Sequence, residues 1–206
     1  MTPRDWSPAA RTGAVRAARV FSNLISPPVM FAIIGLTLAL YAAPGWRGLA
    51  WGITYGLLVS LAPILFVLFM LRTGRIAELH MSNTGERHLP YLVSVFCGLL
   101  VLLLSRLFHG PDLLRCLAWF NVIELAALGI INIFWLISIH ATAMASTVAI
   151  AWLVFGSWTL LITLPLLILV AWVRLFLKRH TPAQIIAGTL LGSLTVLSLT
   201  LAGCFT

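Results

Sequence analysis

The sequence predicts an all-α protein: a polytopic transmembrane helix bundle of about six to seven spans. Hydrophobic residues make up 61% of the 206 residues and charged residues only 9%, whereas soluble domains average roughly 45–50% apolar and about 25% charged residues. The mean hydropathy is +1.07, and the apolar residues occur in runs near the about 20 residues that a membrane span needs. Such a chain cannot cover a globule with polar surface, which excludes an ordinary soluble enzyme, a disordered protein and a disulfide scaffold.

The first 26 residues form a basic segment that precedes the spans. Arg4, Arg11, Arg16 and Arg19 lie in it, and we expect a helix on the membrane surface. Residues 1–26 lack the pattern of a cleavable signal peptide, because the apolar run begins late and no small-residue cleavage site closes it. The transmembrane helical domain is expected to cover residues 27–204.

Seven apolar segments follow in order. They lie at about residues 27–44, 48–71, 90–107, 114–136, 141–157, 159–174 and 182–204. The first begins at Pro27-Pro28, because proline is tolerated in the first turn of a helix. Residues 141–174 are long for one tilted helix and tight for two. Turn residues at Gly156-Ser157 favour two, and the sequence leaves this choice open.

Positive charge predicts the orientation of these spans. With seven spans, one side holds ten basic residues and the other holds three, Arg47, Arg106 and Arg115. Cytoplasmic loops carry the excess of Lys and Arg, so the N-terminus and loops 72–89, 137–140 and 175–181 are expected in the cytoplasm of a bacterial-type inner membrane. The net charge of +8 then suits anionic lipid rather than nucleic acid.

The cysteines are three, an odd number, and widely spaced. Cys97, Cys116 and Cys204 are therefore expected to be free thiols, with no disulfide and no zinc site. We also expect no cofactor.

Polar residues gather in three segments on the predicted cytoplasmic side, at 72–90, 137–140 and 174–184. In the third, Thr181-Pro182-Ala183-Gln184 is typical of a helix start with a capping box. His180 thus precedes a helix N-terminus, whose free amides attract anions. Arg174, six residues earlier, can offer a guanidinium to a phosphate. The segments together predict an anion site.

These residues resemble three short signatures of the type-2 phosphatidic acid phosphatase superfamily, integral membrane lipid phosphatases that share a site with vanadium haloperoxidases. Arg174 and His180, with Gln184 four residues on, resemble the third signature. Ser138-Ile139-His140-Ala141 resembles the second, in a divergent branch that reads K-I-S-x-H-A. Glu86-Arg87-His88-Leu89-Pro90 resembles the end of the first. The resemblance implies a phosphatase/haloperoxidase-like core.

The resemblance also implies roles. His180 would be the nucleophile that forms a phosphohistidine, and His140 the general acid that protonates the leaving lipid alkoxide. The substrate would be a prenyl or glycerolipid phosphate in the membrane, with no metal ion. The other implied site residues are the phosphate-binding Arg174, Arg87 and Ser138 and the orienting Gln184.

An alternative stays open because this sequence departs from the family pattern. Leu136 stands where the branch has lysine, Ile139 replaces a small glycine, and Gln184 replaces the usual aspartate. The alternative is a catalytically inactive phosphatase-like subunit with a structural or assembly role among membrane-protein partners. A transporter is disfavoured, because the halves show no repeat and no paired broken helices.

Two further features lie inside the predicted spans. Glu124 is expected to be neutral or paired, because an ionised carboxylate there costs about 2.5–3.5 kcal/mol; Asn121 and Asn132 are its candidate neighbours. Gly188-x3-Gly192 predicts close helix packing within the bundle.

Overall fold

The computed structural model describes residues 3–5, 7–10, 12–77, 81 and 84–205. The regular structure of these residues is helical throughout, which confirms the all-α prediction. The α-helices are α1 (Gly13–Leu24), α2 (Pro27–Ala42), α3 (Trp46–Tyr55), α4 (Ala62–Arg72), α5 (His88–Leu107), α6 (Asp112–Phe134), α7 (Ile139–Phe155), α8 (Leu160–Phe176) and α9 (Pro182–Thr200). Shorter turns are the 3-10 helices η1 (Pro8–Ala10), η3 (Thr84–Arg87) and η4 (Ser157–Thr159) and the π-helix η2 (Gly56–Leu61), which joins α3 to α4.

All seven predicted apolar segments are helical, but they differ in length. Among the described residues, five helices are long and apolar enough to cross a membrane: Trp46–Arg72, Gly85–Leu107, Asp112–Phe134, Ser157–Phe176 and Pro182–Thr200. The pair α1 and α2, bent by 41°, makes a sixth candidate, and α7 is a shorter apolar helix. The chain therefore has the helices of a polytopic membrane protein, with five to six candidate spans.

The long apolar stretch of residues 141–174 forms two helices. Helix α7 ends at Gly156, whose φ of 92° lies in the left-handed region that glycine adopts at little steric cost. The 3-10 turn η4 then leads into α8. The turn residues at Gly156-Ser157 thus resolve the choice that the sequence left open.

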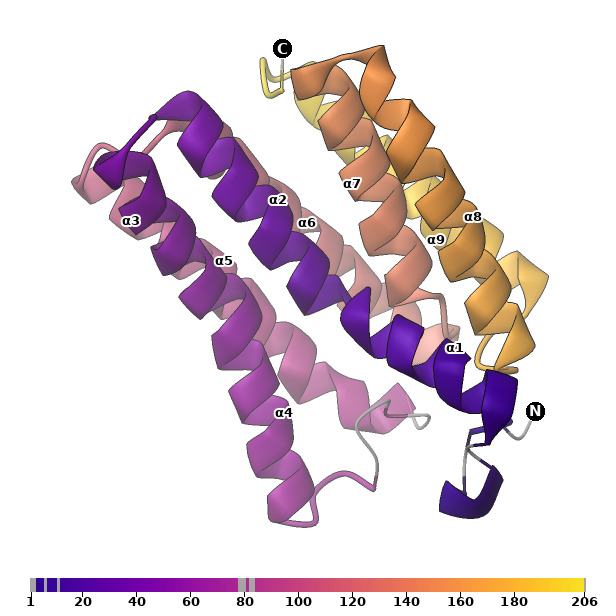
Figure 1. Cartoon of the computed structure of the whole chain (residues 1–206). Helices are drawn as coiled ribbons and strands as arrows, with labels where there is room; N and C mark the ends of the chain where they lie inside the picture. Colours follow the sequence, from indigo (N-terminus) through magenta and orange to yellow (C-terminus); the bar gives the residue numbers. More distant parts are fainter. Residues whose placement is uncertain (1–2, 6, 11, 78–80, 82–83, 206) are drawn as a thin grey trace. The chain divides into compact units, whose positions relative to one another are not determined.

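The chain packs into two compact units, each described here by itself. Unit 1 comprises the described residues up to Met30 together with Ile137–Ser198, and unit 2 comprises Phe31–Leu136 and Leu199–Phe205. Helix α2 leads from unit 1 into unit 2, and α9 leads back into unit 2 at its last residues (Figure 1).

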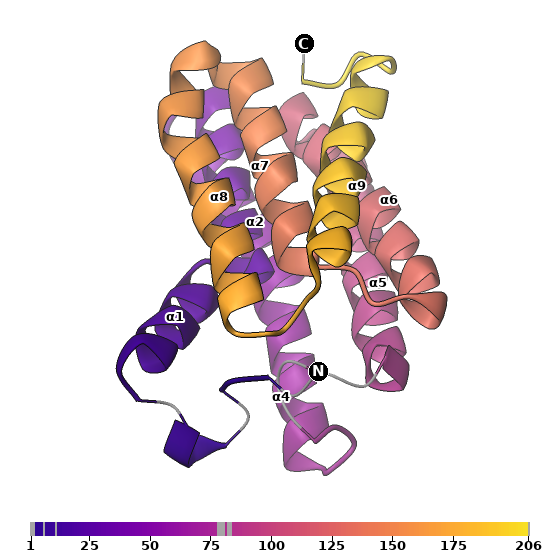
Figure 2. The same ribbon diagram turned by 90° about the vertical axis from the view of Figure 1, so that its right-hand side faces the viewer.

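Unit 1 contains α1, α7, α8 and α9. The start of α7, the end of α8 and the start of α9 lie at one end of this unit, where α1 also lies (Figure 2). Helix α1 packs on α8 through the buried side chains of Ala18, Val173 and Leu177. The basic segment is therefore helical as predicted, and one of its faces is part of the core of unit 1.

Helix α9 approaches α7 closely through its two glycines. A Cβ atom on Gly188 would lie 2.7 Å from the Ser138 carbonyl oxygen, and one on Gly192 would overlap the Thr142 carbonyl oxygen. Only a residue without a side chain fits at either position. The predicted packing role of the glycine pair is confirmed.

Unit 2 contains most of α2 together with α3, α4, α5 and α6. The α5–α6 hairpin contributes fully buried side chains such as Leu114 and Phe120. The Phe120 ring meets Phe31 of α2 edge-on, with ring centroids 6.1 Å apart.

The prediction of three free cysteines was wrong. Cys116, at the start of α6, forms a disulfide with Cys204, and their Cα atoms are 5.5 Å apart. The pair is separated by 88 residues, so only the packing of unit 2, which contains both cysteines, brings the two thiols together. Cys97 is free and buried, as expected.

Candidate anion-binding site

The turn from α8 to α9 begins with a Schellman motif. The Arg179 N–H donates to the Arg174 carbonyl at 3.0 Å, and the Lys178 N–H donates to the Leu175 carbonyl at 2.9 Å. Lys178 has a φ of 52°, the left-handed conformation that this motif requires. The main chain of Arg174 is thus tied to that of Arg179.

A capping box follows immediately, as the sequence predicted. The Thr181 N–H donates to Gln184 Oε1 at 2.9 Å, and the Gln184 N–H donates to Thr181 Oγ1 at 3.3 Å. His180 is the single residue between the two motifs, and it is only 5% exposed. Gln184 therefore stabilises the turn that carries His180, through the backbone of Thr181.

The second predicted segment starts α7 beside this turn. Ser138 is fully buried, and its backbone N–H donates to the Gln184 carbonyl at 3.2 Å. Its side-chain oxygen accepts from the Ala141 N–H at 3.4 Å, as an N-cap residue does. The Ser138 hydroxyl can donate its proton as well, because a serine oxygen accepts and donates at once.

His140 and Arg174 meet at a residue of α1. The His140 Nε2 lies 3.3 Å from the Ser22 carbonyl oxygen, and Arg174 Nη1 donates to Ser22 Oγ at 3.0 Å. All three residues are buried. Ser22 thus joins a predicted catalytic histidine to a predicted phosphate-binding arginine, although they come from different helices.

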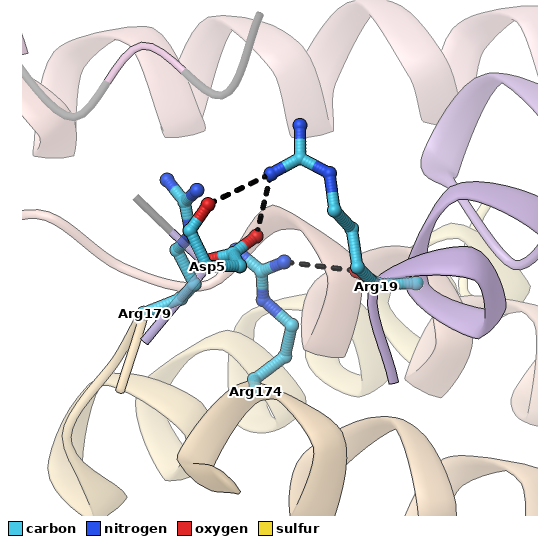
Figure 3. A network of polar contacts seen from close by, with 5 residues as sticks. Asp5, Arg19, Arg174 and Arg179 are labelled. Atoms are coloured by element: carbon cyan, nitrogen blue, oxygen red, sulfur yellow. Dashed lines mark hydrogen bonds and ion pairs between the residues drawn. The ribbon is translucent and has the colours of Figure 1, made fainter. Parts of the chain in front are cut away.

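An aspartate of the N-terminal segment lies within the same arginine-rich region (Figure 3). Arg19 Nη1 donates to Asp5 Oδ2 at 2.8 Å, and Arg179 Nε donates to Asp5 Oδ1 at 2.9 Å. The side chains of Asp5 and Arg179 are 1% and 3% exposed, and that of Arg19 is 20% exposed. Arg174 is linked to the elements that carry both arginines: its Nη1 donates to Ser22 of α1, three residues after Arg19, and its carbonyl accepts from the Arg179 N–H. We call Arg19, Arg174 and Arg179 the arginine cluster.

The arginine cluster gathers positive charge around Asp5. Two of its three guanidinium groups, those of Arg174 and Arg179, belong to buried residues. Buried charge is costly unless it is paired and hydrogen-bonded. A region of this kind is suited to binding an anion.

Sequence reasoning missed Ser22, Asp5 and Arg179. The basic segment before the first span predicts a membrane-surface helix, and nothing in its pattern points to a site within a helix bundle. One signal was present: Asp5 is one of five acidic residues in the whole chain and stands in its most basic segment.

Arg87 belongs to unit 2, whereas the other five predicted site residues belong to unit 1. It is buried, and its Nε donates to the Met81 carbonyl at 2.7 Å. His88 begins α5. His80, in the polar segment 72–90, lies outside the described residues.

Unit 2 has its own buried polar residues, on α6. Asn132 donates to the Tyr91 hydroxyl at 3.2 Å, and Asn121 donates to the Tyr55 hydroxyl. Glu124 is fully buried on the same helix. The partners of the two asparagines are tyrosines on other helices of unit 2, which the sequence analysis had not named.

Within the described residues, no group of three or more His, Cys, Asp or Glu side chains could hold a metal ion. Compared with known proteins, the chain matches no family model, no curated protein and no solved structure.

Proposed function

We propose that the chain is a membrane phosphatase that hydrolyses lipid phosphates at the end of unit 1 where α7 and α9 begin. One observation carries the proposal: His140 and Arg174 contact the same residue, Ser22, and Arg174 belongs to the turn that holds His180. Histidines, a guanidinium and a helix start within one unit supply a nucleophile, a proton donor and anion-binding groups.

The proposed reaction has two steps. A ring nitrogen of His180 attacks phosphorus, a P–N bond forms, and the bond from phosphorus to the lipid oxygen breaks while His140 gives that oxygen a proton. Water then attacks the phosphohistidine, His140 takes up a proton from it, and the P–N bond breaks. Inorganic phosphate leaves and both histidines return to their starting states.

Arg174 and the Ser138 hydroxyl would bind the phosphoryl oxygens as charge develops on them, helped by the positive end of the α9 helix dipole. The family resemblance adds Arg87 as a further phosphate ligand, but the proposal for unit 1 does not depend on it. The lipid part of the substrate, a prenyl or acyl chain, would remain among the apolar helix surfaces. Exposed side chains such as Leu161 and Ile168 on α8 are compatible with contact to lipid.

We further propose that this end of unit 1 faces the cytoplasm of a bacterial-type inner membrane. Helix α9 has 19 residues, about 28 Å at about 1.5 Å per residue, which is close to the roughly 30 Å of a bilayer core. His180 precedes α9 and Cys204 follows it, so a membrane-spanning α9 puts them on opposite faces. Disulfides persist in oxidising compartments, so Cys204 supports an external location for its end, in agreement with the distribution of basic residues.

The experiment is phosphate release by the detergent-purified chain from phosphatidic acid, phosphatidylglycerol phosphate and prenyl mono- and diphosphates. We expect the wild type to release phosphate from at least one substrate. The rate of release should fall by about a thousandfold or more in His180→Ala and His140→Ala. The matched control is His109→Asn, at an exposed turn where the φ of 53° suits asparagine; it should retain activity. Equal rates for the wild type and His180→Ala on every substrate would refute the proposal.

The second candidate is a phosphatase-like subunit without catalytic activity. The observation that favours it is the pairing of Arg19 and Arg179 with Asp5, which gives two cations an internal partner. This candidate predicts no phosphate release by the wild type and co-purification with other membrane proteins. Release that depends on His180 would exclude it.

A further inference from the structure

The Asp5 carboxylate binds two members of the arginine cluster, Arg19 and Arg179, in the way that a bound anion would. We infer that Arg19, Arg174 and Arg179 form an anion site, that Asp5 occupies it in this conformation, and that a phosphoryl group binds there by displacing Asp5. The N-terminal segment is then an internal competitor of the substrate. The inference rests on the proposed function for its ligand, a phosphate monoester.

The geometry of Asp5 supplies the first argument. Its two carboxylate oxygens are bound by different arginines, at 2.8 and 2.9 Å, and its main-chain carbonyl accepts a third hydrogen bond from Arg19 at 3.2 Å. Asp5 therefore presents three oxygens to two guanidinium groups (Figure 3). A phosphoryl group also presents three oxygens, and guanidinium groups bind phosphate and carboxylate with the same fork of donors.

Charge supplies the second argument. Asp5 contributes one negative charge to a cluster of three guanidinium groups, whereas a phosphate monoester carries about −1.5 to −2 at neutral pH. Exchange of the carboxylate for a phosphoryl group would bring more negative charge to the three guanidinium groups. The added charge strengthens the attraction between the cluster and the ligand.

The position of the arginine cluster supplies the third argument. Arg179 directly precedes His180, and the Arg174 carbonyl accepts the hydrogen bond that closes their turn. Arg174 also contacts Ser22, which His140 contacts. A phosphoryl group bound by the cluster would thus lie in the neighbourhood of the proposed nucleophile.

Besides Asp5, the N-terminal segment contacts the end of α8 through Arg4. The Arg4 N–H donates to the Leu177 carbonyl at 3.0 Å, and the Arg4 guanidinium lies 4.7 Å from the centre of the Phe176 ring. Asp5 is joined to α1 by a short stretch of chain, which gives it a high effective concentration at the cluster. A ligand must compete with this tethered carboxylate. The apparent affinity of the ligand is therefore its intrinsic affinity multiplied by the fraction of molecules in which Asp5 has left the site.

The first test is the binding of inorganic phosphate to the full detergent-purified chain, measured by titration calorimetry at constant ionic strength. In Asp5→Asn, which keeps the shape but removes the charge, we expect phosphate to bind about tenfold or more tightly than in the wild type. The matched control is Asp112→Asn, which removes an exposed carboxylate paired with Arg115 and should leave phosphate affinity unchanged. Equal or weaker binding in Asp5→Asn overturns the inference.

A second test keeps Asp5 and so does not depend on the folding of that variant. Ser7 is exposed, and Ser7→Cys can carry a fluorophore because the native cysteines are disulfide-bonded or buried. We expect inorganic phosphate to change the emission with the same saturation curve as in calorimetry. Phosphate that binds without any change in the emission overturns displacement of Asp5.

Both tests are repeated in the His180→Ala background, which separates this inference from the proposed reaction. One outcome is tighter phosphate binding in Asp5→Asn with no turnover by the wild-type chain. It would support the anion site and refute the phosphatase. The opposite outcome is turnover that depends on His180, with unchanged phosphate affinity and unchanged KM in Asp5→Asn. It would support the phosphatase and refute the displacement of Asp5.

Discussion

Arg174 and Arg179 of unit 1 and Asn121 and Asn132 of unit 2 are buried polar residues that differ in charge. In unit 1, guanidinium groups and histidines gather where helices begin and end, as with Arg174 at the last turn of α8 and His140 at the first turn of α7. In unit 2, Asn121 lies in the middle of α6 and Asn132 in its last turn. Each of these neutral amides also donates to a carbonyl one turn earlier on its own helix, at 2.8 Å.

Buried polar side chains can link helices to one another or bind a ligand, and the two groups of residues suit different roles. Within a span, an amide that bonds a tyrosine and its own helix leaves no net charge in the apolar region, which suits a link between helices. At helix ends, capping turns fix the backbone while long cationic side chains converge, which suits a ligand. The contrast supports the proposal of ligand binding in unit 1 and gives Asn121 and Asn132 of unit 2 the role of linking helices.

The largest effect on stability is expected from Cys204→Ser. Loss of a disulfide that closes 88 residues should lower the free energy of unfolding by about 2–4 kcal/mol, measured by denaturant titration in detergent. Because the disulfide belongs to unit 2, phosphate binding in unit 1 should not change. Counting alkylated cysteines after denaturation should give one without reductant and three with it, and three in both cases would contradict the disulfide.

The next effect is on catalysis. Arg174→Lys keeps the charge but loses the guanidinium fork, so we expect kcat to fall by about a hundredfold with a small shift in the unfolding midpoint. Asn132→Ala is its counterpart in unit 2 and should show the reverse, a lowered midpoint with kcat within a few fold of wild type. The comparison of the units fails if Asn132→Ala loses as much activity as Arg174→Lys.

A smaller effect is expected at the contact between α9 and α7. Gly188→Val would place carbon atoms against the Ser138 carbonyl and should cost about 1–3 kcal/mol of stability, together with part of the activity. Gly56→Ala, where nothing lies within 4 Å of the added Cβ and the backbone is helical, should gain about 0.5–1 kcal/mol. Thermal unfolding of both variants measures the difference, and a neutral Gly188→Val would contradict the close approach.

The smallest effect is expected from the capping box. Thr181→Ala removes the side-chain acceptor of the Gln184 N–H and should cost about 1 kcal/mol, with a modest loss of kcat because the same turn holds His180. Thr181→Ser keeps the hydroxyl oxygen and should restore both values. Activity unchanged in Thr181→Ala would mean that the turn does not need its cap to hold His180.

Local signals predicted the helices and the turns well. Gly156 marked the break between α7 and α8, and Thr181 and Gln184 formed the expected capping box, because these structures depend on neighbours within a few residues. The disulfide was missed because Cys116 and Cys204 are joined by topology and not by spacing. The Asp5 contacts were missed for the same reason, since Arg179 lies 174 residues away along the chain.

The sequence by itself determined that this protein is a helical chain with several apolar helices of membrane-spanning length, because hydropathy and helix signals are local and additive. It also indicated which polar residues to examine, through the order of Ser138, His140, Arg174 and His180. Only the tertiary structure decided that Ser22 joins His140 to Arg174 and that Asp5 pairs with Arg19 and Arg179. The physical reason is that a buried charge takes its partner from whatever segment the packing of helices brings close, and that choice is made across the fold.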